Sequence, residues 1–223
     1  MSNKISRLDY CQYLLSSQTN YTLTNFAEHV AGLNHQLVNR YLSTDKLTAR
    51  IVWEHVKSDI IPSNDGFIIF DDTVIDKNHS KHIDSVRWQY SGNAHGVIRG
   101  IGLVNCVYVN PETKQFWIID YRLFDPLRDG KGKIDHVRDM LNNIVNHKKL
   151  SFSTVLMDTW YANKQLMFFI HRLGKKFYCP IAKNRLAYVG EADTKFKPVS
   201  ELNWNEDDRT FLKRTKIIHI SQV

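Results

Sequence analysis

The sequence has no apolar run that approaches the length of a membrane span, so we do not expect a transmembrane protein. Its beginning, MSNKISRLDYCQ, lacks the apolar segment of a signal peptide. The chain has only three cysteines, Cys11, Cys106 and Cys179, whose wide spacing fits neither a disulfide framework nor a cysteine metal site. These absences argue against membrane-spanning and disulfide-stabilised classes, and they predict a cytoplasmic protein with reduced, structural thiols.

Acidic residues are in the minority. The chain has 23 Asp and Glu against 30 Lys and Arg, which gives a net charge of +7 and a pI of about 9.2. This excess favours a polyanionic partner such as nucleic acid, although many basic proteins bind none. The 223 residues suffice for one large domain, or for a large and a small one.

The most informative stretch is GFIIFDDTVIDK, at residues 66–77. Its apolar run predicts a buried central strand that ends at two adjacent carboxylates, Asp71 and Asp72. A second short apolar strand, residues 154–157, ends at Asp158. Carboxylates at the ends of buried strands are costly unless a cation compensates them, and a divalent metal is the usual one. The pattern therefore predicts a metal-dependent phosphoryl-transfer site.

Residues 1–61 have helical patterning and predict a small helical domain that ends at a linker around Pro62. Its third helix is expected at residues 48–56. A turn at Gly32 and a helix cap at Asn34 resemble a helix-turn-helix, although Glu28 replaces the small residue usual in its first helix. A plain helical hairpin is the alternative. In the first interpretation, the second helix would present these side chains to DNA: His35, Gln36, Asn39 and Arg40.

A polar stretch at residues 77–95 is expected to be a loop beside the proposed metal site. It combines cations with aromatic side chains: Lys77, His79, Lys81, His82, Arg87, Trp88, Tyr90 and His95. Such a loop suits phosphate groups and stacked bases, and a solvated surface loop is the alternative. Its histidines do not have the spacing of zinc ligands.

The chain from residue 66 to 182 predicts the order strand, strand, strand, helix, strand, helix, strand. After the first strand, these elements are expected at residues 97–110, 116–124, 133–147, 154–157, 164–173 and 176–181. This is the order of the ribonuclease-H-like fold, an α/β (α+β) architecture with a mixed sheet and flanking helices. Its first and fourth strands are central neighbours, so Asp72 and Asp158 are expected side by side.

The segments IIFDDTVIDK and VLMDTWYAN resemble the catalytic core of insertion-element DDE transposases. The resemblance is to the group with a DDT motif on the first strand and a D-x-W-Y-type motif after the fourth. It covers roughly residues 66–181 and agrees with a DNA-binding region before them. It implies that Asp72 and Asp158 are catalytic metal ligands, and that Asp71 and Thr73 support the site.

The resemblance also implies a mechanism and partners. Two Mg²⁺ or Mn²⁺ ions would activate the nucleophile and stabilise the leaving oxygen of a DNA phosphodiester. The expected partners are transposon ends bound by a synaptic homodimer, and no membrane. Contacts with DNA are expected from Lys77, Trp160, Tyr161, Lys183 and Arg185. The alternatives are packing under the site for the two aromatic residues and a solvated loop for the last two cations.

In this family a third acid, a glutamate, lies on a helix that follows a β-rich insertion. Residues 183–223 resemble the start of that insertion, with a strand-like pattern at residues 210–220. The later glutamates, Glu191, Glu201 and Glu206, do not lie on an amphipathic helix. The expected function is therefore that of a transposase in a truncated, inactive or incomplete form.

Two other functions stay open. The chain could be a DNA-binding regulator of transposition with a vestigial core. It could also be a ribonuclease-H-like nuclease whose third acid is one of the late glutamates. Metal-dependent DNA cleavage would separate the two enzymes from the regulator.

Overall fold

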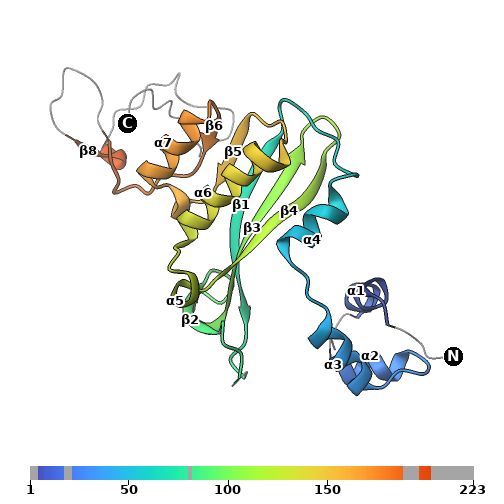
Figure 1. The fold of residues 1–223 in the computed structure, drawn as a ribbon. Helices are drawn as coiled ribbons and strands as arrows, with labels where there is room; N and C mark the ends of the chain where they lie inside the picture. Colours follow the sequence, from blue (N-terminus) through green and yellow to red (C-terminus); the bar gives the residue numbers. More distant parts are fainter. Residues whose placement is uncertain (1–4, 18–21, 80–81, 188–195, 202–223) are drawn as a thin grey trace. The chain divides into compact units, whose positions relative to one another are not determined.

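The computed structural model describes residues 5–17, 22–79, 82–187 and 196–201 (Figure 1). The chain folds as two compact units, Met1–Thr48 and Ala49–Val223. None of the helices in the described segments is long and apolar enough to cross a membrane. The strand pattern expected at residues 210–220, and the late Glu191 and Glu206, lie outside the described residues.

The first unit consists of three helices: α1 (Arg7–Ser16), α2 (Leu23–His29) and α3 (His35–Thr44). The turn between α2 and α3 contains Gly32, whose φ of 80° lies in the left-handed region that glycine tolerates. Asn34 then caps α3, because its side chain accepts a hydrogen bond from the Leu37 N–H at 2.8 Å. Phe26 and Val38 bring α2 and α3 into one small core.

The second unit is built on one mixed sheet. Its strands are β1 (Phe67–Asp76), β2 (Arg87–Ser91), β3 (Gly96–Asn110), β4 (Gln115–Phe124), β5 (Thr154–Met157) and β6 (Lys176–Tyr178). Antiparallel pairing joins β3 to β1, β2 and β4, and parallel pairing joins β1 to β5 and β5 to β6. The mixed sheet with flanking helices confirms the expected fold class.

Helices cover this sheet and connect its strands. They are α4 (Ala49–Val56), α5 (Pro126–Asp129), α6 (Lys133–Asn143), the π-helical turn η1 (Ile144–Lys148), the 3₁₀ turn η2 (Thr159–Tyr161) and α7 (Lys164–Arg172). A short pair, β7 (Leu186–Ala187) and β8 (Lys197–Pro198), precedes the 3₁₀ turn η3 (Val199–Glu201). Residues of α6, η1 and α7 share one buried core with β1, β3 and β5, and this core fixes the strand ends that carry the aspartates.

Three local features differ from the sequence-based expectations. The stretch at residues 77–95, expected to be a loop, contains β2, which pairs with the first part of β3. The helix expected at residues 48–56 forms as α4, but Trp53 and Val56 pack on the core of the sheet, so the compact units divide before it. The helix expected through residue 147 changes to a π-helical turn at Ile144.

Two glycines lie where β3 exchanges one partner for another along its length. β3 pairs with β2 up to Gly100 and with β4 from Gly102 onward. A Cβ atom at Gly100 would lie 2.6 Å from the backbone oxygen of Ile75, whereas one at Gly102 would meet the end of the flexible Gln89 side chain. The close approach of the β1 backbone therefore requires glycine at position 100.

A buried ion network lies between β4 and η1. Asp120 is 1% exposed, and its carboxylate lies 2.8 Å from Arg122 Nη1 and 3.2 Å from Lys148 Nζ. The ring of Trp53 covers the Lys148 ammonium, with 4.9 Å between the nitrogen and the ring centroid. The π-helical turn places Lys148 at this point, because it shifts the end of the helix relative to regular α-helical spacing.

Candidate active site

The two motif aspartates lie on neighbouring strands, Asp72 within β1 and Asp158 just after β5. In the parallel pairing of β1 with β5, Phe70 is opposite Met157; Asp158 directly follows Met157, and Asp72 is the second residue after Phe70. Asp158 is also the N-cap of η2, because its side chain accepts a hydrogen bond from the Trp160 N–H. The expectation that the first strand ends at Asp71 and Asp72 is wrong, because pairing with β3 continues β1 to Asp76.

Both carboxylate oxygens of Asp72 have partners from other elements. Lys133 Nζ, at the start of α6, donates to Asp72 Oδ2 at 2.5 Å. The Tyr161 hydroxyl, in η2, donates to Asp72 Oδ1 at 3.0 Å. The Lys133 ammonium also lies 5.1 Å from the ring centroid of Trp160 and 5.4 Å from that of Phe124. Asp72 is thus the centre of a cluster drawn from β1, β4, α6 and η2.

Tyr161 is fully buried, and this corrects its expected role as a DNA contact. Burial, and then the negative charge of Asp72, raise the pKa of Tyr161 far above its usual range, with further contributions from Asp71 and Asp158. The phenol therefore stays protonated and remains a hydrogen-bond donor. Its side chain packs under the site and positions Asp72, which is the alternative that the sequence left open.

Replacing Tyr161 with phenylalanine removes only the hydroxyl. Because a hydrogen bond to a charged group is lost, we expect the free energy of unfolding of the second unit to fall by about 1.5 kcal/mol. Urea unfolding followed by tryptophan fluorescence measures this, since all five tryptophans lie beyond residue 48. A fall close to zero would mean that water replaces the hydroxyl at Asp72 without loss.

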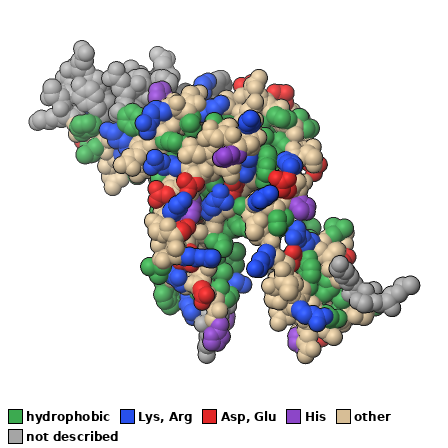
Figure 2. Space-filling model, in the orientation of Figure 1, with side chains coloured by type: hydrophobic (Ala, Val, Ile, Leu, Met, Phe, Trp, Pro, Cys, Tyr) green, Lys and Arg blue, Asp and Glu red, His purple; other side chains and the backbone are tan. Residues whose placement is uncertain are grey.

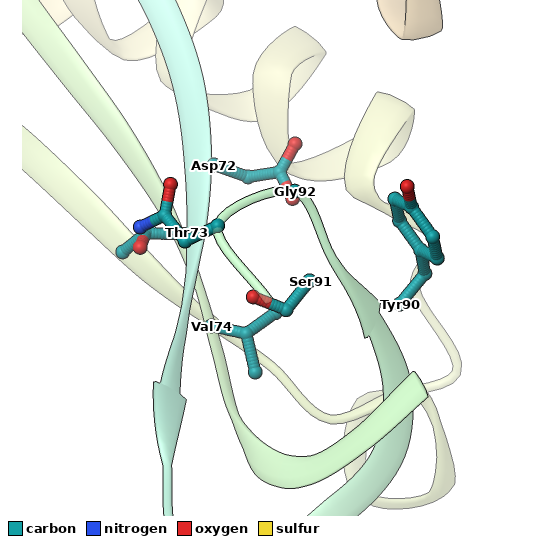
Figure 3. A pocket seen from close by; sticks show the side chains of 7 residues that line it. Asp72, Thr73, Val74, Tyr90, Ser91 and Gly92 are labelled. Atoms are coloured by element: carbon teal, nitrogen blue, oxygen red, sulfur yellow. The ribbon is translucent and has the colours of Figure 1, made fainter. Parts of the chain in front are cut away.

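A small pocket of about 60 Å³ opens beside Asp72. Residues of β1 and of the segment at the end of β2 surround it, as Figure 3 shows: Asp72, Thr73, Val74, Tyr90, Ser91, Gly92 and Asn93. Tyr90 is 62% exposed. The stretch at residues 77–95, which was expected beside the proposed metal site, therefore contributes a wall of the pocket next to Asp72.

The donor chemistry of the two aspartates suits a divalent cation. Carboxylate oxygens are the ligands that Mg²⁺ and Mn²⁺ prefer. Within the segments that the structure describes, however, no cluster of three or more His, Cys, Asp or Glu side chains is arranged to hold a metal ion. The oxygen atoms fit such a cation, whereas the surroundings of Asp72 are arranged around a lysine ammonium.

The remaining expected site residues differ in their exposure and in their hydrogen-bond partners. Asp71 is exposed, and its side chain accepts a hydrogen bond from the Asp72 N–H at 2.9 Å. Trp160 is 56% exposed. Arg185 donates to the backbone oxygen of Ala162, directly after η2, so the structure brings this cation to the site. Lys183 is exposed on the same segment.

The other expected DNA contacts are Lys77, shortly after Asp72 in the sequence, and four side chains of α3 in the first unit. Lys77 follows β1, and its backbone N–H donates to the Arg99 backbone oxygen at 2.9 Å. In the first unit, four side chains of α3 are all exposed: His35, Gln36, Asn39 and Arg40. Figure 2 shows Lys and Arg side chains on the visible face of each unit, with acidic side chains among those of the second unit.

Sequence reasoning missed Lys133 and Phe124 as members of the Asp72 cluster, whereas it did expect the stretch that contains Tyr90 beside the site. Lys133 lies 61 residues from Asp72 in the chain, so no local motif joins them. A signal was nevertheless present. A lysine as the first residue of a helix faces the positive end of the helix dipole, which is unfavourable unless an acidic partner is near.

A search of curated protein sequences found no match. Two solved structures of Mos1 transposase are similar, its paired-end complex with the left transposon end and its pre-cleavage transpososome. Their identities are 15% and 13%, with TM-scores of 0.29 and 0.27, and the match covers 78% of this chain and 58% or 59% of theirs. The piggyBac transposase synaptic complex with hairpin DNA is 12% identical, with a TM-score of 0.38 and coverage of 82% of this chain and 38% of that chain.

A family model described as DDE superfamily endonuclease matches residues 4–202, which is most of the chain. The match includes both aspartate motifs and the helices before them. It confirms the family that these motifs indicate: the chain belongs to the DDE superfamily endonucleases.

Proposed function

We propose that this chain is a transposase whose Asp72 and Asp158 hold divalent metal at a DNA phosphodiester. Members of the family generally use divalent metal ions. The observation that carries the proposal is the parallel pairing of β1 with β5, in which Asp72 on β1 lies near the end of β5, where Asp158 follows. When bound, the metal supplies a lowered pKa for the attacking hydroxyl and charge stabilisation for the leaving oxygen.

The surrounding side chains hold the reacting groups in place. Tyr161 keeps Asp72 oriented through its hydrogen bond. Arg185, tied to the segment after Asp158, contributes positive charge for a phosphate group. Trp160 offers an exposed ring on which a base at the DNA end can stack. Lys77 and Lys183 add phosphate contacts at the margin of the site.

DNA recognition is assigned to the first unit. The second helix of its helix-turn-helix, α3, would enter the major groove, with Gln36, Asn39 and Arg40 at the base edges and His35 beside them. Binding should weaken steeply as salt rises, because phosphate contacts release counterions. A synaptic homodimer on two transposon ends completes the proposal.

A second candidate function is a DNA-binding regulator of transposition with a catalytically silent core. The observation in its favour is the Lys133 ammonium at Asp72, which neutralises the carboxylate without a metal. The regulator would use α3 in the same way and would show no cleavage. The two candidates therefore differ only in what the second unit does in the presence of metal.

Plasmid nicking tests the proposed function. The full chain is incubated with supercoiled plasmid in Mg²⁺, in Mn²⁺ and in EDTA, and the nicked and linear products are quantified on gels. We expect nicking with either metal and none in EDTA. Retained DNA binding in a mobility-shift assay, with no nicking in either metal, would contradict the enzymatic proposal and support the regulator.

A further inference from the structure

The ammonium group of Lys133 occupies a confined place at Asp72. It lies 2.5 Å from Asp72 Oδ2, between the rings of Trp160 and Phe124. The Lys133 side chain is 12% exposed and that of Asp72 is 20% exposed. An ion pair this well shielded from water is weakened little by solvent screening, unlike the surface pair of Lys131 with Asp139.

The backbone around Lys133 holds the side chain at this place. Gly130, with φ of 69°, is the C-cap of α5, and Gly132 is the N-cap of α6. The Asp135 carboxylate accepts a hydrogen bond from the Gly132 N–H at 2.9 Å and so fixes the first turn of α6. Lys133 is the first residue of that turn, where a cation is unfavourable with respect to the helix dipole. Asp72 compensates this cost.

We propose that Lys133 is the resident counter-ion of Asp72, and that a divalent cation must displace it in order to bind. The proposal rests on the function proposed above, since it concerns the same carboxylate. A metal ion would bind a carboxylate oxygen at roughly 2.0–2.2 Å, which is the space that the ammonium occupies at Oδ2. The ammonium would repel a metal ion bound at that oxygen, because the two like charges would lie close together in a site that is largely shielded from water.

The exchange gives Lys133 two positions with different partners. Before metal binds, its ammonium neutralises Asp72 and keeps a partly buried carboxylate from being left without a counter-charge. After metal binds, the displaced ammonium is a cation next to the site, where the Trp160 ring, which it already contacts, is one remaining partner. Lys133 therefore lowers the affinity of the site for metal.

Mn²⁺ titration of the full chain, followed by the loss of the free-ion signal in electron paramagnetic resonance, tests the exchange. Removal of the competing ammonium in Lys133→Gln should tighten Mn²⁺ binding about tenfold, the size of effect that changes beside a metal ligand produce. Lys131→Gln is the matched control, because it removes a lysine two residues away whose partner is Asp139. Its Mn²⁺ affinity should equal that of the wild type.

Asp72→Asn separates the inference from the proposed function. If Asp72→Asn weakens Mn²⁺ binding while Lys133→Gln leaves it unchanged or weaker, the metal site stands and the exchange is overturned. If Asp72→Asn binds Mn²⁺ as the wild type does, the metal lies elsewhere and both proposals fail. Lys133→Met, which keeps the apolar stem between the two rings, serves in the same titration if the glutamine variant does not fold.

Amine labelling of the wild-type chain gives a second readout. The rate at which an amine-reactive ester modifies Lys133 is followed by mass spectrometry with and without Mn²⁺, with the exposed Lys131 as internal reference. We expect Mn²⁺ to raise the labelling of Lys133 several-fold relative to Lys131. An unchanged ratio at saturating Mn²⁺ would mean that the ammonium does not leave Asp72, and the exchange would be overturned.

Discussion

Replacing Asp72 with asparagine is expected to lower the rate of metal-dependent DNA nicking by at least about a hundredfold, the loss typical of removing one group that stabilises the transition state. The amide keeps the size of the side chain and can still accept a hydrogen bond from Tyr161. It lacks the negative charge that a divalent cation requires from its ligand. Nicking of supercoiled plasmid, measured as an initial rate, gives the comparison.

Asp71→Asn is the matched control for this experiment. Asp71 is the adjacent carboxylate, but it is exposed and its side chain accepts a hydrogen bond from the strand itself, at the Asp72 N–H. We expect this variant to retain most of the nicking rate. Both variants should bind DNA with the affinity of the wild type, since α3 is untouched. Equal losses in the two variants would contradict the assignment of Asp72 as the ligand.

The largest expected effect on stability concerns the buried network at Asp120. Asp120→Ala leaves the Lys148 ammonium, 5% exposed, without its carboxylate partner. Removing one member of a buried pair costs more than the pair contributes, because the remaining charge is left uncompensated. We expect the free energy of unfolding of the second unit to fall by about 3 kcal/mol.

Asp139→Ala is the matched control for Asp120→Ala and is measured by the same method. Asp139 pairs with Lys131, and both side chains are nearly half exposed, at 44% and 46%. Its loss should cost less than about 0.5 kcal/mol. Urea unfolding followed by tryptophan fluorescence measures both variants, because Trp53 lies against Lys148 and reports on this region. A cost for Asp120→Ala as small as that for Asp139→Ala would show that water reaches the network.

The central part of the fold could be predicted because its signals are local. β5 is a short apolar run followed by an aspartate, β1 begins with such a run, and the order of elements then makes the two strands neighbours. The continuation of β1 to Asp76 was not predicted, because it depends on pairing with β3. β2 was harder to recognise, because Trp88 and Tyr90 alternate with polar residues on a strand whose aromatic side chains are exposed. The polar composition of residues 77–95 suggested a loop, but backbone pairing with β3 makes part of this stretch a strand.

The contacts of Asp72 could not be predicted, because they depend on tertiary packing. The place of Lys133 at the start of a helix indicates an acidic partner, but the sequence does not say which carboxylate it is. Only the packing of α6 against the sheet brings its ammonium to β1. The burial of Tyr161 could not be predicted either, because the adjacent Trp160 is exposed and the sequence does not distinguish the two aromatic residues.

The parallel pairing of β1 with β5 has a consequence for how the chain acquires its site. Tyr161 and Asp72 are 89 residues apart, so their hydrogen bond forms only after a long segment has closed into place. Contacts at such separation slow folding, because the entropy of closing the loop is lost before the contact forms. During synthesis from the N-terminus, the three-helix unit can fold while β5 is still unmade. The Asp72 carboxylate is therefore among the last groups of the chain to reach its final surroundings.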